Sequence, residues 1–152
     1  MIRNVSRVDH VAGLVRLENL DSVIERMSTV LQTSFHGPFD RPQSGMRVAV
    51  SIDAGIELIA PLSPDPDNPL NRLLAERGEH WVSVVFGVRS MDATCDHLAR
   101  LGYKPTWRGS PLQGDEPYIE RVARMDYASF DPGLFHGLPC ILAEIEERGP
   151  AG

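Results

Sequence analysis

The stretch "DHVAGLVRLENLD" at residues 9–21 decides the fold, because a second copy of its plan appears later in the chain. The later copy is "HWVSVVFGVRSMD" at residues 80–92. Each copy runs as an apolar segment, then a turn with an arginine, then an aspartate that opens a helical pattern. His10 of the first copy aligns with Ser83 of the second. An internal repeat of this size indicates two similar modules.

Composition places the chain among soluble globular proteins. Its 152 residues suit one domain, and 42% of them are hydrophobic and 24% charged. No apolar run approaches the ~20 residues of a membrane helix. The net charge of -6, without a Lys/Arg cluster, argues against nucleic acid as a partner. With only Cys95 and Cys140 and no secretory signal, we expect a cytoplasmic protein acting on a small molecule.

Both halves predict the same order of elements, strand–helix–strand–strand–strand, within one domain over residues 1–152. The first module covers about 7–62 and the second about 79–147. Strands are expected at 8–16, 46–52, 56–62, 82–88, 118–130 and 139–147, and helices from Asp21, at 70–78 and at 90–102. Residues 33–45 read as turn-rich, and 103–117 as looped or edge-like. The fold class is therefore α+β, with two tandem βαβββ modules whose sheets curve around a shared cavity.

Each module ends in a strand that carries a carboxylate among apolar neighbours. "IEL" at 56–58 and "AEI" at 143–145 align in the repeat, so that Glu57 falls opposite Glu144. One interpretation is that each glutamate faces solvent on the polar side of its strand. Because burying an unpaired carboxylate is costly, the other is a shared site with His10. One imidazole and two carboxylates suit a divalent cation such as Zn, Fe, Mn, Ni or Co.

The repeat resembles the vicinal oxygen chelate superfamily, which includes glyoxalase I, methylmalonyl-CoA epimerase, extradiol dioxygenases and bleomycin-resistance proteins. The epimerase-like branch is closest: its pattern "IDHVAIAV" matches "VDHVAGLV" at 8–15, and "RGEGLHHIAF" aligns without gaps with "RGEHWVSVVF" at 77–86. "FDPGLFHGLPCILAEI" at 130–145 resembles the family's ending. The resemblance implies the glyoxalase-like fold, and homodimers are common in the family.

The resemblance also implies a metal site. His10 matches the first-strand ligand, Glu57 the first-module ligand and Glu144 the last-strand ligand, which is also a candidate for moving a proton. The remaining family ligand is a histidine, and here that position is Ser83, whose neutral hydroxyl is a poor ligand for these metals. Val48 stands where the epimerases keep an acid/base glutamate, which argues against a true methylmalonyl-CoA epimerase.

Two further histidines are weaker candidates. His80 lies three residues before Ser83, so a regular strand points it to the other face unless a β-bulge intervenes. His136 precedes Gly137 in the turn before the last strand and suits the surface or the mouth of a cavity.

Two functions remain open. The first is a metal-assisted isomerase, epimerase or lyase acting on a small carbonyl compound or a CoA thioester. The second is a metal-free cavity protein that binds or sequesters a small hydrophobic or aromatic molecule, with Ser83 marking a repurposed site.

Overall fold

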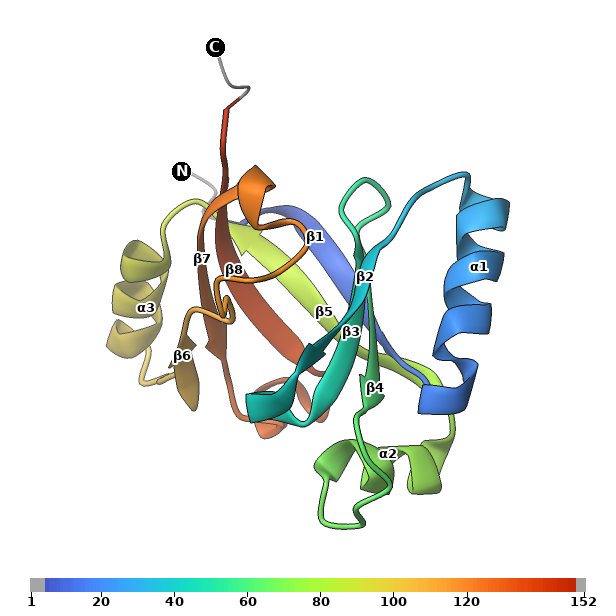
Figure 1. Ribbon diagram of the computed structural model, residues 1–152. Helices are drawn as coiled ribbons and strands as arrows, with labels where there is room; N and C mark the ends of the chain where they lie inside the picture. The colour runs from blue at the N-terminus through green and yellow to red at the C-terminus, as the bar shows by residue number, and fades with distance from the viewer. Residues whose placement is uncertain (1–4, 150–152) are drawn as a thin grey trace. The chain divides into compact units, whose positions relative to one another are not determined.

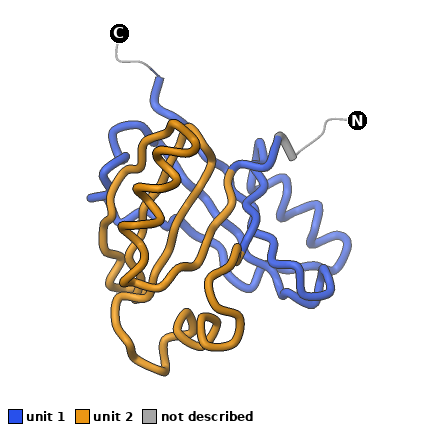
Figure 2. Tube along the Cα trace, turned by 90° about the vertical axis from the view of Figure 1, so that its right-hand side faces the viewer, with its two compact units in different colours: residues 1–9, 83–152 blue, residues 10–82 orange. Residues whose placement is uncertain are grey.

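The computed structural model describes residues 5–149, and the chain divides into two compact units. Among the described residues, one unit is formed by residues 10–82, and the other by residues 83–149 together with residues 5–9 at the start of the first strand. Figure 2 colours them orange and blue. Each unit holds one module of the repeat.

The first module is a four-stranded sheet with one long helix. Its elements are β1 (Val5–Leu14), α1 (Leu20–Leu31), β2 (His36–Arg41), β3 (Met46–Ser51) and β4 (Ile56–Pro61). The strands lie in the order β2-β3-β4-β1 (Figure 1). β3 is antiparallel to both neighbours, while β1 pairs with β4 in parallel.

The second module repeats this arrangement. Its elements are β5 (His80–Val88), α3 (Met91–Arg100), β6 (Trp107–Gly109), β7 (Val122–Ser129) and β8 (Cys140–Glu147). The strand order is β5-β8-β7-β6, with β5 parallel to β8 and the other pairs antiparallel. The predicted α+β fold of two βαβββ modules is thus confirmed. Short 3₁₀ turns lie at Leu17–Asn19, Pro42–Ser44, Ile119–Arg121 and Pro132–Phe135.

The connector carries α2 (Pro69–Arg77), which begins and ends as the sequence predicts. The Asn68 side chain accepts a hydrogen bond from the Leu70 N–H at 2.9 Å, and Pro69 takes the first helical position. Gly78 closes the helix with a φ of 67°. None of the helices in residues 5–149 has the length and apolar character needed to cross a bilayer.

Each sheet buries one face under its own helix, here called the helix face. Leu58 lies on this face in the first module and Leu142 in the second. Val15 and Val88, at the ends of the two repeats, pack on the same faces. The core under α1 consists of Val15, Leu20, Ile56, Leu58 and Ala60, and the core under α3 of Val88, Met91, Ala128, Phe130 and Leu142.

The other face of the first sheet, here called the opposite face, has its own apolar cluster. Leu14, Val48, Ile59 and Leu74 are buried there, and side chains of α2 pack against them. Because strand side chains alternate between faces, His10 and Ala12 share the opposite face with Leu14. Glu57 likewise shares it with Ile59. This face therefore combines a hydrophobic core with the candidate site residues.

One strand was missed by the sequence interpretation. The turn-rich stretch at 33–45 contains β2, whose pairing with β3 shifts between His36 and Phe39. Gly37, with a φ of 101°, and Pro38 account for the turn-like reading. A proline is tolerated in β2 because the strand lies at the edge of its sheet.

We expect Leu58→Ala to destabilise the protein by about 2–5 kcal/mol, because the side chain is buried beneath α1 and its loss leaves a cavity. Val30→Ala on the exposed side of α1 serves as the control and should change stability by less than about 0.5 kcal/mol. Urea unfolding measures both. Equal losses in the two variants would contradict the assignment of the helix-face core.

Candidate functional site

His10 and Glu57 meet on the opposite face of the first sheet. In the register of β1 with β4, Ala12 pairs with Glu57, and His10 lies two residues before Ala12 on the same face. The His10 Nε2 atom is 3.9 Å from the Glu57 Oε2 atom. Their side chains are 13% and 18% exposed, so the pair is largely shielded from water but still accessible to a small molecule. Two of the predicted site residues are thus brought together.

The surroundings of the pair are mainly apolar. Val50 of β3 pairs with Glu57, and Val48 lies two residues further along the same strand face. Val48 is fully buried in the cluster with Leu14. A titratable pair at the edge of such a cluster acts in a lower dielectric than in water, which strengthens its electrostatic effect on a bound molecule.

The second module has different residues at the equivalent positions. Val85 pairs with Ile141 in the register of β5 with β8, as Ala12 pairs with Glu57 in the first module. Ser83 is two residues before Val85, as His10 is before Ala12. The equivalent of Glu57 is therefore Ile141.

The predicted equivalence of Glu57 and Glu144 is accordingly wrong by three residues. An odd shift reverses the face of a strand, so Glu144 shares the helix face with Leu142. The matching position in the first module is Ala60, which is buried beneath α1. The motifs "IEL" and "AEI" look alike, but they occupy different positions in their strands.

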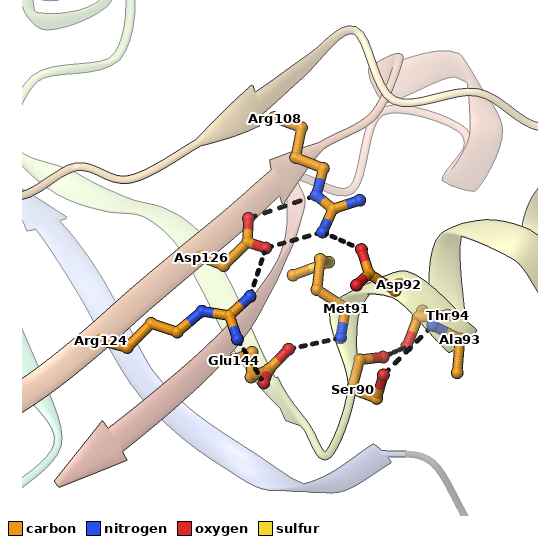
Figure 3. Close-up of polar contacts among 9 residues, drawn as sticks. All are labelled: Ser90, Met91, Asp92, Ala93, Thr94, Arg108, Arg124, Asp126 and Glu144. Carbon is orange, nitrogen blue, oxygen red and sulfur yellow. Dashed lines mark hydrogen bonds and ion pairs between the residues drawn. The ribbon is translucent and has the colours of Figure 1, made fainter.

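The Glu144 carboxylate is bound by residues of its own module (Figure 3). Its Oε2 atom accepts a hydrogen bond of 2.6 Å from the N–H of Met91, the first residue of α3. Its Oε1 atom lies 3.5 Å from the Arg124 guanidinium. A carboxylate at a helix N-terminus compensates the free N–H groups and the positive end of the helix dipole. These contacts give Glu144 a structural role in holding α3 on the sheet.

Arg108 extends this set of charges on the helix face. Figure 3 shows its guanidinium between the carboxylates of Asp126 on β7 and Asp92 on α3. The distance to Asp126 Oδ2 is 2.8 Å, and Arg124 reaches the same oxygen at 3.4 Å. Hydrogen bonds from Arg108 lower the pKa of Asp126, and the positive charges nearby add to this effect, which outweighs the opposing effect of burial. Sequence reasoning missed this network because its members come from distant segments.

The two weaker histidine candidates lie in turns or at strand ends. His80 Nδ1 donates to the Gly78 carbonyl at 2.7 Å, which fixes the ring at the entrance of β5. His136 follows the turn at Pro132–Phe135, has a φ of 52° and is exposed. Among the residues that the structure describes, neither belongs to a group of side chains that could hold a metal ion.

The donor atoms do not fit the four-ligand metal centre that the resemblance implies. Within residues 5–149, no three His, Cys, Asp or Glu side chains are arranged so that they could hold an ion. His10 and Glu57 supply two donors, Ser83 and Ile141 take the equivalent positions in the second module, and Glu144 is bound on the helix face.

The first unit also contains a cavity of about 450 Å³ that the sequence did not indicate. Its walls come from the end of β4, the turn after β1, the connector and α2. They consist of Arg16, Leu17, Glu18, Pro61, Ser63, Pro64, Asn71, Leu74 and Ala75. Neither His10 nor Glu57 lines it, so the cavity is separate from the candidate site.

Comparison with known proteins supports the fold. No protein-family model and no curated protein matches the chain. A solved methylmalonyl-CoA epimerase is 14% identical, with 96% of this chain and 99% of that chain covered and a TM-score of 0.76. The enzyme from Mycobacterium tuberculosis is 23% identical over 95% of this chain and 92% of that chain, with a TM-score of 0.71. The Streptomyces coelicolor enzyme in complex with 2-nitronate-propionyl-CoA is 20% identical over 92% and 97%, with a TM-score of 0.70.

These structures confirm the predicted glyoxalase-like fold. They are epimerases, the branch of the vicinal oxygen chelate superfamily that the sequence resembles most closely. At these identities the likeness establishes the fold, and the reaction has to be argued from the residues of this chain.

The lowered pKa of Asp126 makes a pH-dependent prediction. Because the folded-state pKa lies below the unfolded value of about 3.9, the stabilisation is present above that pH and is lost as the pH falls through the folded-state pKa. We expect Asp126→Asn to be less stable than the wild type by about 2 kcal/mol at pH 7, with the difference shrinking below about pH 4.

Asp40→Asn is the matched control for this measurement. Asp40 also pairs with an arginine, Arg47, but its side chain is 43% exposed against 12% for Asp126, so solvent screens the pair. Urea unfolding between pH 7 and pH 3 compares the two variants. An Asp126→Asn deficit that is independent of pH would contradict the role of the ionised carboxylate.

Proposed function

We propose that the chain is an enzyme of the vicinal oxygen chelate type that moves a proton next to a carbonyl group. The reaction would be an isomerisation, an epimerisation or a lyase-type elimination, and the substrate a small carbonyl compound or a CoA thioester. The single observation that carries this proposal is the His10–Glu57 pair, 3.9 Å apart on the opposite face of the first sheet.

An imidazole and a carboxylate are the side chains that proteins use most often to move protons. The spacing of the pair is too long for a direct hydrogen bond but short enough for both groups to contact one small molecule. The fold adds support, because the solved epimerases share it and one of them holds a propionyl-CoA analogue. The substrate class is taken from that likeness and from the resemblance of the sequence.

The divalent ion expected from the resemblance, whether Zn, Fe, Mn, Ni or Co, remains a prediction. His10 and Glu57 are the two expected ligands that the structure brings together. The expected role of Glu144 as a ligand and proton carrier also remains a prediction, and it would require the carboxylate to leave Met91 and Arg124.

One observation favours the alternative of a binding protein for a hydrophobic or aromatic molecule. The pairing of β8 with β5 and with β7 brings apolar side chains together on the opposite face of the second sheet: Val85, Met125, Tyr127, Ile141 and Ala143. Trp107 of β6 lies on the same face beside Gly109, where an added Cβ atom would be 3.1 Å from the indole ring. A half-exposed indole on an apolar surface suits the stacking of a flat ring.

The finer properties of the protein also remain predictions. A cytoplasmic location and the absence of nucleic-acid and membrane partners follow from composition. A homodimer is expected because the family pairs in this way and edge strands gain from being covered. Size-exclusion chromatography with light scattering would test the dimer.

Hydrogen exchange tests the enzyme proposal. With methylmalonyl-CoA and propionyl-CoA as probes in D₂O, we expect the protein to accelerate deuterium uptake at the carbon next to the thioester carbonyl, measured by mass spectrometry. His10→Ala and Glu57→Gln should each slow this exchange by about 10²–10⁴-fold, the usual contribution of one acid/base group.

Two exposed residues of the same types provide controls. His97→Ala and Glu25→Gln should leave the exchange rate unchanged, since both side chains lie on solvent-exposed parts of their helices. Exchange that is unaffected by His10→Ala and Glu57→Gln would remove the pair from the mechanism. No acceleration with either probe would refute the proposal for these thioesters.

Tryptophan fluorescence tests the alternative. If 1-naphthol binds the apolar face of the second module, Trp107→Ala should weaken binding by about 3–10-fold, the value of one aromatic stacking contact. Trp81→Ala is the control, because Trp81 is similarly exposed at 55% but packs over Gly13 in the first unit. Equal effects of the two substitutions, or no binding, would rule out this face as the ligand site.

A further inference from the structure

We propose that this chain works without a resident metal ion, with Glu57 as the base and His10 as the acid. The inference rests on the proposed function for the chemistry and on the set of donor side chains for the absence of a metal. Its structural basis is that the two modules no longer match: the first keeps an imidazole and a carboxylate, and the second has Ser83 and Ile141 in their places.

The equivalence of these positions is fixed by landmarks outside the site. Leu58 pairs with Gly13 on the helix face of the first module, and Leu142 pairs with Phe86 on that of the second. The residues just before the two leucines are Glu57 and Ile141, so both face away from their helices. An isoleucine offers no donor atom to a cation.

Glu144 cannot make up for this loss by changing its rotamer. It leaves β8 on the helix face, and its carboxylate is held there by the Met91 N–H and by Arg124. Bringing it to the opposite face would require a shift of β8 by one residue against β5 and β7, which would break the pairing of Leu142 with Phe86 and Ala128. Leu142 and Ala128 are buried core residues, so such a shift is costly.

Two donors are too few for a firmly bound catalytic ion. Catalytic zinc sites in proteins commonly have three protein ligands and structural sites have four. The first module supplies only His10 and Glu57, whose Nε2 and Oε2 atoms lie 3.9 Å apart.

The proton transfer balances without a further reactant. Glu57 takes the proton from the carbon next to the carbonyl, and the electron pair of the broken C–H bond forms the C=C bond of an enol. The carbonyl π electrons move to the oxygen, which receives the proton of His10. Return of the proton from Glu57 to the carbon, and of the enol proton to His10, restores both groups. Acid and base thus act on one substrate at the same time.

The first experiment measures metal binding directly. Protein freed of metal by chelation is titrated with Zn²⁺, Mn²⁺, Co²⁺ or Ni²⁺ in a calorimeter, alongside His10→Ala and Glu57→Gln. We expect no stoichiometric binding that either substitution weakens by more than twofold. Stoichiometric binding of any of these ions that both substitutions weaken by tenfold or more would overturn the proposal.

Glu144→Gln separates the structural from the metal-binding role of that residue. We expect it to lower the midpoint of thermal unfolding, because Met91 loses a charged acceptor, and to leave the metal titration unchanged. Glu146→Gln, exposed on the same strand, is the matched control and should alter neither. Loss of metal binding in Glu144→Gln would restore Glu144 as a ligand and refute the inference.

The exchange assay then distinguishes this inference from the proposed function. We expect the metal-free protein to keep its full rate of deuterium uptake and to change by less than twofold when an ion is added. A rate that depends on added metal and on His10 overturns the inference but keeps the function. A titration without metal binding, combined with no exchange, supports the absence of a metal but refutes the proposed function.

Discussion

The alternation of side chains along a strand is the constraint on which the site depends. It places His10 of β1 and Glu57 of β4 on one face, because the parallel register aligns Ala12 with Glu57. The same rule sends Glu144 to the helix face of the second module, where it meets α3. The parity of a sequence position thus decides which face of its sheet a side chain occupies, and a side chain cannot change face without a shift of its strand.

Much of the fold could be predicted because its signals are local and repeated. The apolar pattern of residues 9–21 and its copy at 80–92 predicted the two modules, and Asn68 with Pro69 predicted the start of α2. β2 was missed because a Gly–Pro step resembles a turn, and only pairing with β3 makes the stretch a strand. Pairing is a long-range property, and local sequence carries little information about it.

The candidate site was predicted in part for a related reason. His10 stands in a motif that aligns without gaps with the pattern of the resembling family. Glu57 lies in the strand that was expected at residues 56–62. The position of Glu144 depended on aligning two short motifs across segments of unequal length. An alignment error of three residues leaves the two motifs similar in sequence but puts the side chain on the other face of its sheet. The ion network of Arg108 could not be foreseen, since its partners come from α3 and β7.

Ala60 and Glu144 occupy equivalent positions beneath their helices, and the two residues seat the helices in different ways. Beneath α1 the position is filled by a methyl group, whereas beneath α3 a carboxylate is accommodated because the helix presents a free N–H to it. The same position therefore holds the helix on its sheet by packing in the first module and by a charged hydrogen bond in the second.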